Sequence, residues 1–414
     1  MKNLGTAQHT ALSSLPLVAQ ADLNIQGRSR TNPLPWRGQF SPQLVETLLQ
    51  TYGESGDRRI LDPFVGSGTV LIEAARLGYS AFGAEINPAA MALASTYCFV
   101  NLDKSARNVA LQNVEALLEK CGLRSDLSLF SRESTADMRP DLLSQRNLLS
   151  IGQERVILDA LIVLADFTNV PLTPPVVASK WISLRRLIES LPQSDEPIVA
   201  AFADARRLPL PDASIDLIVT SPPYINVFNY HQQYRGSVEA LGWDVLAAAK
   251  SEIGSNRKHR SNRLLTVVQY CLDMAMVLDE MRRVARPNGR MIVVVGRESN
   301  VRKTAFFNAQ ILAEIAVECL NLKVLLQQER EFTNRFGQII REDILIIDFV
   351  GTKTVSFDTV REIAIRQLQS AFLRAPLEAR SDFSEAISFA RTVQPSNFCA
   401  FDDVRFFGRD FTNG

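Results

Sequence analysis

Residues 58–85 read RRILDPFVGSGTVLIEAARLGYSAFGAE, and their pattern predicts the fold of the chain. A short apolar run, residues 60–61, leads into a glycine loop, residues 66–68. Apolar residues then recur at helical spacing until Gly78, and a second apolar run ends at Glu85. A strand, a helix and a strand in this order form one βαβ unit, whose two strands lie parallel in a sheet.

The rest of the chain repeats this alternation after one long interruption. Strand-like and helical runs return after residue 197, and the late runs KVLLQQEREF and EDILIIDFV are typical of an antiparallel hairpin. The sequence predicts a Rossmann-like α/β fold: an open, mostly parallel sheet with a late antiparallel strand and a largely helical insertion. The expected parts are a flexible arm (1–30), a catalytic domain (31–104 and 198–350), the insertion (105–197) and a C-terminal segment without an assigned role (351–414).

Composition is that of an ordinary globular protein. Of the 414 residues, 46% are apolar and 22% are charged, and 45 basic side chains balance 45 acidic ones, so a nucleic-acid partner would need a local basic patch. We see no membrane span or signal peptide and expect a cytoplasmic protein. Five scattered cysteines and three distant histidines predict neither a disulfide framework nor a metal site.

Acidic residues follow three predicted strands, at the edge where open α/β sheets bind ligands. They are Asp62, Glu85 and Asp204. A carboxylate at the position of Glu85 can accept hydrogen bonds from both ribose hydroxyls of a nucleotide. Any one of the three acids, taken alone, would be interpreted as a solvent-exposed surface side chain. Asp62 would repel a pyrophosphate but suits an ammonium group, and Leu71 replaces the third glycine of the dinucleotide fingerprint. This pattern favours S-adenosylmethionine over a nicotinamide cofactor.

The run IDLIVTSPPY, residues 215–224, ends a predicted strand at two prolines. Neither proline has a backbone N–H, and Pro223 pushes Pro222 out of the helical region. One interpretation is a rigid turn without further function. The other is a stiff loop that presents carbonyl oxygens and Tyr224 to a substrate.

The motifs DPFVGSGT, GAEINP and ADARRLPLPDASIDLIVTSPPY together resemble the amino-methyltransferases of DNA. The Ser-Pro-Pro-Tyr form is similar to the cytosine-N4 branch, whereas adenine-N6 enzymes more often carry Asn or Asp in place of Ser221. The resemblance covers about residues 31–100 and 198–350, with the cofactor motif before the catalytic motif. The insertion and the tail match no family pattern.

This resemblance implies a role for each matching residue. The methionine end of S-adenosylmethionine would be lined by Asp62, Phe64, Gly66, Gly68 and Thr69. Glu85 would hold the ribose, Asp204 and Ala205 would meet the adenine, and Ser41 would bind the methionine carboxylate. In the catalytic loop of Ser221, Pro222, Pro223 and Tyr224, the Ser221 hydroxyl and the Pro222 carbonyl would accept the amine hydrogens. Tyr224 would stack on a flipped cytosine.

Double-stranded DNA is the implied partner. The run SNRKHRSNR contains no acidic residue, and its basic residues are Arg257, Lys258, Arg260 and Arg263. One interpretation is that these residues bind DNA phosphates, and the other is a solvated loop without a role in binding. The candidates for reading the base sequence are the insertion, which we prefer, and the C-terminal segment. The alternative roles for the helices of the insertion are a structural cap and an oligomer contact. The alternatives are an adenine-N6 or RNA methyltransferase and a catalytically silent binding module. The recognition sequence, a cognate restriction endonuclease and the oligomeric state stay open.

Overall fold

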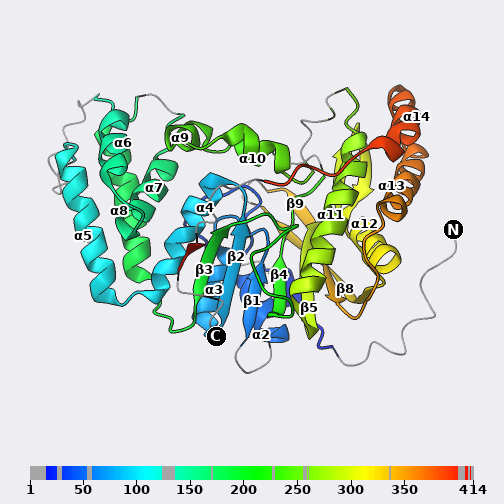
Figure 1. Ribbon diagram of the computed structural model, residues 1–414, viewed down its shortest axis with the longest axis horizontal. Coiled ribbons are helices and arrows are strands. Elements are labelled where there is room, and N and C mark those ends of the chain that lie inside the picture. The colour runs from blue at the N-terminus through cyan, green and yellow to red at the C-terminus, as the bar shows by residue number, and fades with distance from the viewer. Residues whose placement is uncertain are drawn as a thin grey trace.

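The computed structural model describes residues 15–25, 30–53, 58–123, 136–168, 171–225, 229–254, 259, 261–334, 337–399, 406–408 and 411. Within these residues the chain forms an eight-stranded sheet with helices on both faces, as Figure 1 shows. The predicted open α/β architecture is therefore confirmed.

The sheet has the strand order β10-β3-β2-β1-β4-β5-β9-β8. Its strands are β1 (Arg59–Asp62), β2 (Ser80–Glu85), β3 (Ile198–Phe202), β4 (Ile215–Thr220), β5 (Ala285–Gly296), β8 (Lys323–Thr333), β9 (Ile339–Asp348) and β10 (Phe406–Phe407). β9 runs antiparallel to both β5 and β8, which confirms the predicted hairpin. β10 is a second antiparallel strand, paired with β3, that the sequence did not indicate. A small separate hairpin, β6 (Glu298–Val301) and β7 (Thr304–Phe307), was also missed.

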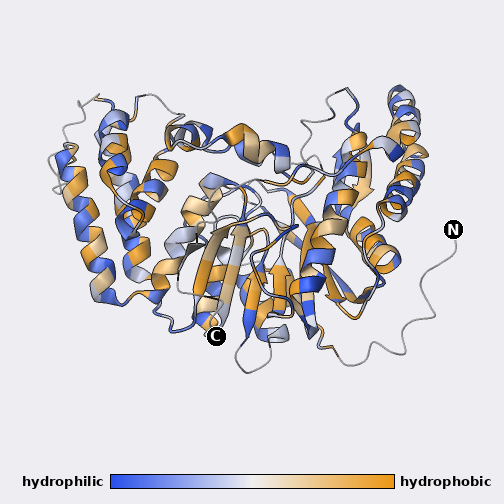
Figure 2. Ribbon diagram, viewed as in Figure 1, coloured by the Kyte–Doolittle hydropathy of each residue, from blue (hydrophilic) through white to orange (hydrophobic). Residues whose placement is uncertain are grey.

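Two helical layers bury the two faces of the sheet. Neighbouring strand residues point to opposite layers: Ile60 and Ile292 pack on one side, Leu61 and Val293 on the other. The first layer contains α2 (Pro42–Tyr52), α3 (Thr69–Leu77) and α4 (Pro88–Ala94). The second contains α11 (Leu265–Val284), α12 (Asn308–Glu314), α13 (Phe357–Phe372) and α14 (Arg380–Phe389). Figure 2 shows the apolar strands between these layers.

The interruption between β2 and β3 is helical, as expected, and lies beside the sheet (Figure 1). After η1 (Ser95–Asn101) it contains α5 (Lys104–Lys120), α6 (Arg139–Leu148), α7 (Gln153–Ala165) and α8 (Pro174–Ser190). The buried Arg107 joins its two ends, because the guanidinium donates hydrogen bonds to the carbonyls of Leu102 at 2.9 Å and Pro192 at 2.7 Å. The two ends of the helical insertion therefore lie next to each other, beside the sheet.

Two short helices cross above the carboxyl ends of the strands. Figure 1 shows α9 (Arg235–Ala240) and α10 (Val245–Ser251) between the helical insertion and α11. Ser237 in α9 donates a 2.8 Å hydrogen bond to the carbonyl of Ile162 in α7. The chain that follows the Ser-Pro-Pro-Tyr loop is thus anchored to the insertion. Among the described residues, no helix combines the length and apolar character required to cross a bilayer.

Two local features differ from expectation. Residues 15–25 fall in the expected flexible arm but lie against β8, where Gln328 donates a 2.9 Å hydrogen bond to the carbonyl of Val18. The Pro-Asn-Gly run at residues 287–289 is a typical turn sequence, but it lies inside β5, as a bulge in the pairing of β5 with β4. The Pro-Asn-Gly run therefore interrupts the pairing without ending the strand.

Candidate active site

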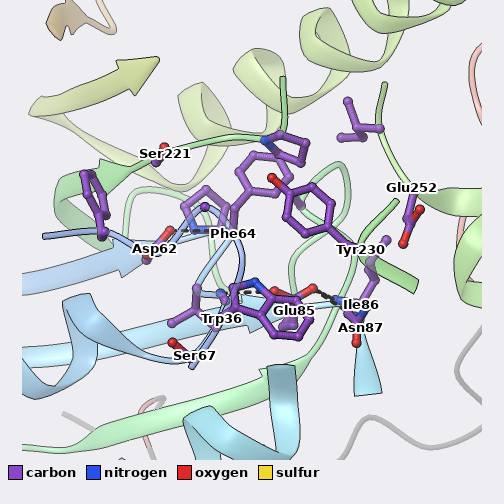
Figure 3. A pocket seen from close by; sticks show the side chains of 18 of the residues that line it. Trp36, Asp62, Phe64, Ser67, Glu85, Ile86, Asn87, Ser221, Tyr230 and Glu252 are labelled. Carbon is purple, nitrogen blue, oxygen red and sulfur yellow. Dashed lines mark hydrogen bonds between the residues drawn. The ribbon is translucent and has the colours of Figure 1, made fainter. Parts of the chain in front are cut away.

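The carboxyl ends of the parallel strands open into one pocket (Figure 3). Asp62 ends β1, Glu85 ends β2, and Ser221 follows β4. The predicted site residues that line this pocket are Asp62, Phe64, Gly66, Thr69, Glu85, Asp204, Ala205, Ser221 and Pro223. Ser41, Gly68, Pro222 and Tyr224 lie outside its lining.

The glycine loop owes its shape to two positive φ angles. Gly66 has φ 51° and Gly68 has φ 92°, both in the left-handed region that glycine adopts without strain. A Cβ atom on Gly68 would lie 2.6 Å from the Tyr97 ring, so only glycine fits there. Gly68 therefore packs against Tyr97 on the side of the turn away from the pocket, whereas Gly66 lines the pocket.

Asp62 is a buried carboxylate that faces the pocket with one oxygen. Its Oδ1 accepts hydrogen bonds from the Thr220 hydroxyl at 2.7 Å and the Phe64 amide at 3.0 Å. No donor among the described residues is recorded on Oδ2. Burial raises the pKa of Asp62 to about 7, against the opposing effect of these hydrogen bonds. A cationic group in the pocket would favour the ionised form.

Glu85 joins the glycine loop to the turn after β2. Its Oε1 accepts from the amides of Ile86 at 2.9 Å and Asn87 at 2.8 Å, and its Oε2 accepts from the Gly66 amide at 3.1 Å (Figure 3). Burial raises its pKa to about 7. Oε1 already accepts two hydrogen bonds, but Oε2 accepts only one, so Glu85 keeps one acceptor site for a hydroxyl group of a ligand.

Asp204 is more heavily engaged than the sequence suggested. Its carboxylate forms a buried ion pair with Arg206 at 2.6 Å and accepts a 3.1 Å hydrogen bond from the Cys399 amide. Arg206 also pairs with the buried Asp273 and donates to the carbonyl of Ser396 at 2.8 Å. This cluster fixes residues 396–399 of the C-terminal segment at the edge of the pocket.

The Ser-Pro-Pro-Tyr loop follows β4 directly. Ser221 faces the pocket, Pro222 is buried, and the Ser221 and Tyr224 hydroxyls lie 3.3 Å apart. The Tyr224 ring packs so closely on Gly296 that a Cβ there would lie 3.0 Å from it. Burial raises the pKa of Tyr224, so it stays a neutral phenol. The loop is thus held by its tyrosine as well as by its prolines.

Residues 36–40 form one wall of the pocket, and the sequence analysis did not predict their place there. Trp36 stacks on Tyr230, with ring centroids 6.2 Å apart and planes at 16° (Figure 3). Gln39 and Asn32 donate hydrogen bonds to the hydroxyls of Ser67 at 3.1 Å and Thr69 at 2.9 Å. The proline-rich, aromatic run NPLPWRGQF was a signal for such a wall, because it combines rigidity with ring surface.

A second cavity, of about 830 Å³, adjoins the first and shares Ser221 and residues 38–40 with it. Ser41 lines this second cavity, as do Arg330, Phe332 and Glu342 of the β8–β9 hairpin. The hydroxyl expected to meet the methionine carboxylate therefore lies on the far side of the shared wall from Asp62.

The basic run is only partly described. Arg263 is exposed, while Arg257, Lys258 and Arg260 lie outside the described residues. In the described part of the chain, no group of three or more potential ligands could hold a metal ion.

Comparison with known proteins adds to this geometry. Residues 21–96 match the N6_N4_Mtase family model, described as DNA methylase. The type II methyltransferase M.MjaII of Methanocaldococcus jannaschii is 44% identical over 54 residues, 13% of this chain and 10% of that protein. The type II methyltransferase M.BsoBI of Geobacillus stearothermophilus is 22% identical over 279 residues, 53% of this chain and 54% of that protein. These matches support the N6/N4 DNA-methylase family. They also support S-adenosylmethionine as the cofactor.

Other matches are shorter or more distant. The tRNA (guanine(10)-N2)-dimethyltransferase of Methanothermobacter thermautotrophicus is 36% identical over 73 residues, 18% of this chain and 21% of that protein. A Methanosarcina mazei protein described as a SAM-dependent methyltransferase has a TM-score of 0.34 and 14% identity, covering 75% of this chain and 98% of that chain. The chain spans about half or less of the length of the three curated relatives that it matches.

Proposed function

We propose that this protein transfers a methyl group from S-adenosylmethionine to the N4 amine of a flipped cytosine in double-stranded DNA. The observation that supports this most is the shared pocket, in which two buried acids at adjacent strand ends face Ser221 of the proline-stiffened loop. An ammonium, a ribose and a reactive methyl group would each meet a suited partner there.

The cofactor would lie along the strand ends. The Asp62 carboxylate would bind its ammonium group, and Glu85 would hold the ribose by accepting one of its hydroxyls at Oε2. Phe64, Gly66 and Thr69 would flank the methionine end. Asp204 and Ala205 would border the adenine, with Asp204 acting mainly through the loop that it orders, since Arg206 occupies its oxygens. Ser41 has no part in this arrangement because it lines the other cavity.

Methyl transfer requires the amine lone pair, which is delocalised into the cytosine ring. The Ser221 hydroxyl oxygen and the Pro222 carbonyl would accept hydrogen bonds from the two amine N–H groups and direct the lone pair at the sulfonium methyl. The N–CH3 bond would form as the S–CH3 bond breaks, S-adenosylhomocysteine would leave, and the methylated nitrogen would lose one proton to solvent. Pro223 would keep these acceptors in place. Such catalysis rests on position and electrostatics, without a covalent intermediate.

The target amine is inaccessible in a stacked duplex, so the base would have to leave the helix. Stacking on an aromatic ring can return about 1–3 kcal/mol of that cost, and Tyr224 is our candidate for this contact. Arg257, Lys258, Arg260 and Arg263 would grip phosphates. Their joint neutralisation should weaken DNA binding and flatten its salt dependence; an unchanged slope would exclude them. We assign target recognition to the helical insertion.

Two alternatives keep the cofactor and change the acceptor. Adenine-N6 methylation belongs to the same family description, and the match to a tRNA dimethyltransferase motivates a test of RNA. The relatives named as type II methyltransferases motivate a search for a cognate restriction endonuclease.

Calorimetry with S-adenosylmethionine and transfer of its labelled methyl group test this proposal together. We expect binding, and label on unmethylated double-stranded DNA but not on RNA. Ser221→Ala should lose transfer while retaining cofactor binding, and Gln310→Ala, on the exposed face of α12, should retain both. Absent cofactor binding would instead indicate a silent binding module.

A further inference from the structure

An ion pair of the β8–β9 hairpin lies next to the catalytic loop. The Tyr224 ring packs on Gly296, Gly296 pairs with Glu342 across β5 and β9, and Glu342 pairs with Arg330 across β9 and β8. This register places Arg330 at the same edge of the sheet as Ser221. Both residues, with Glu342, line the second cavity.

Arg330 is buried but incompletely bonded. Only 4% of its side chain is exposed, and its Nε lies 2.9 Å from Oε2 of Glu342. The guanidinium lies over the Phe332 ring, 4.4 Å from the centroid, which fixes its plane. Its Nη1 has no hydrogen-bond partner among the described residues. A buried charged donor without a partner is costly, and such groups are typical of ligand sites.

The neighbouring cross-strand pair shows that this arrangement is not a general property of the hairpin. Glu331 and Arg341 sit one residue along each strand and therefore point to the opposite face. Their ion pair of 2.8 Å is largely exposed, with 46% and 58% of the side chains accessible. Solvent satisfies that pair, whereas the buried Arg330 borders the second cavity.

We propose that Arg330, held by Glu342 and Phe332, reads the Watson–Crick edge of the flipped cytosine in the second cavity. Cytosine presents two adjacent acceptors there, N3 and O2, beside its N4 amine, and a guanidinium fork presents two parallel donors. Adenine presents a single acceptor, N1, beside its N6 amine. The fork therefore selects cytosine over adenine.

Glu342 has a second role in this assignment. The target nitrogen becomes cationic as it accepts the methyl group, and an isolated guanidinium nearby would oppose that charge. The carboxylate of Glu342 balances the charge of Arg330, so the ion pair is nearly neutral overall. This inference rests on the proposed function, because it requires cytosine as the acceptor.

The test compares two paired substitutions in the full chain. Arg330→Met with Glu342→Gln removes the inner pair without leaving a buried lone charge, and Arg341→Met with Glu331→Gln removes the outer pair as the matched control. The substrate is a duplex carrying the site found by sequencing methylated host DNA. A second duplex carries 3-deazacytosine at the target, which lacks the N3 acceptor but keeps the amine.

We expect the inner variant to lose roughly ten- to hundredfold in kcat/KM for the cytosine duplex, the range for one bidentate base contact, with cofactor affinity unchanged. The analogue should slow the native protein and the outer variant but not the inner one. Equal kinetics of the two variants, or loss of cofactor affinity in the inner one, would overturn the assignment. A native protein that methylates only adenine would refute the proposed function itself, whatever the variants do.

Discussion

The Asp62 carboxylate accepts a 2.7 Å hydrogen bond from the Thr220 hydroxyl, which joins the end of β1 to the end of β4. Asp62 belongs to the proposed cofactor site, and Thr220 directly precedes Ser221 of the catalytic loop. Because both groups are buried, this bond couples the two halves of the site. A ligand that moves Asp62 would also move the loop.

The substitution Asp62→Asn separates the contribution of Asp62 to cofactor affinity from its contribution to the stability of the fold. The oxygen of the new amide can accept both existing hydrogen bonds, while its nitrogen would face the ligand's ammonium. We expect the dissociation constant of S-adenosylmethionine to rise roughly ten- to hundredfold, the equivalent of one charged hydrogen bond of about 1.5–3 kcal/mol. At pH 8 the unfolding free energy should stay equal or increase, because a buried charge is removed. Calorimetry and denaturant unfolding measure the two effects, and unchanged cofactor affinity would place the ammonium elsewhere.

The same buried acids predict opposite pH trends for binding and stability. Burial raises the pKa of Asp62 and of Glu85 to about 7. Ammonium binding needs the ionised carboxylate, so cofactor affinity should rise as the pH increases through 7 and then level off. In the absence of ligand the folded chain holds protons that the unfolded chain releases, so the unfolding free energy should fall between about pH 4 and 7.

Titrations of the unfolding free energy from about pH 4 to 8 and of cofactor affinity from about pH 5.5 to 8.5 would measure the two trends. Asp62→Asn should flatten each of them, leaving the part that comes from Glu85. A binding curve that falls with pH would contradict ionised acids as the cofactor ligands.

The sequence predicted those site residues that belong to local patterns. Asp62, Glu85 and Ser221 each follow an apolar run that is readable as a strand, so their convergence follows from parallel pairing. Trp36 and Arg330 come from segments whose positions depend on long-range packing, which one sequence does not reveal. The prediction that Asp204 meets the adenine did not anticipate its ion pair with Arg206. The other partners of Arg206, at residues 273 and 396, lie far along the chain, so the sequence did not reveal this cluster.

Two glycines with similar backbone conformations allow steric fit to be separated from strain. Gly68 has φ 92° and Gly78 has φ 74°, but only Gly68 contacts another residue at the Cβ position, the Tyr97 ring at 2.6 Å. Gly78→Ala should cost about 1–2 kcal/mol of unfolding free energy and leave cofactor binding intact. Gly68→Ala should cost more and weaken binding, because the loop must shift. Calorimetry that finds the two variants equal in cofactor affinity would contradict the role of Gly68 in shaping the site.

The identity of the methylated nucleoside tests the proposed reaction most directly. DNA and RNA from a host without DNA methylation are incubated separately with the protein and methyl-labelled S-adenosylmethionine, then hydrolysed and analysed by mass spectrometry, with Ser221→Ala as the control. We predict labelled N4-methylcytosine from the native protein and none from the control. Label on N6-methyladenine, or label on RNA alone, would contradict a cytosine-N4 methyltransferase.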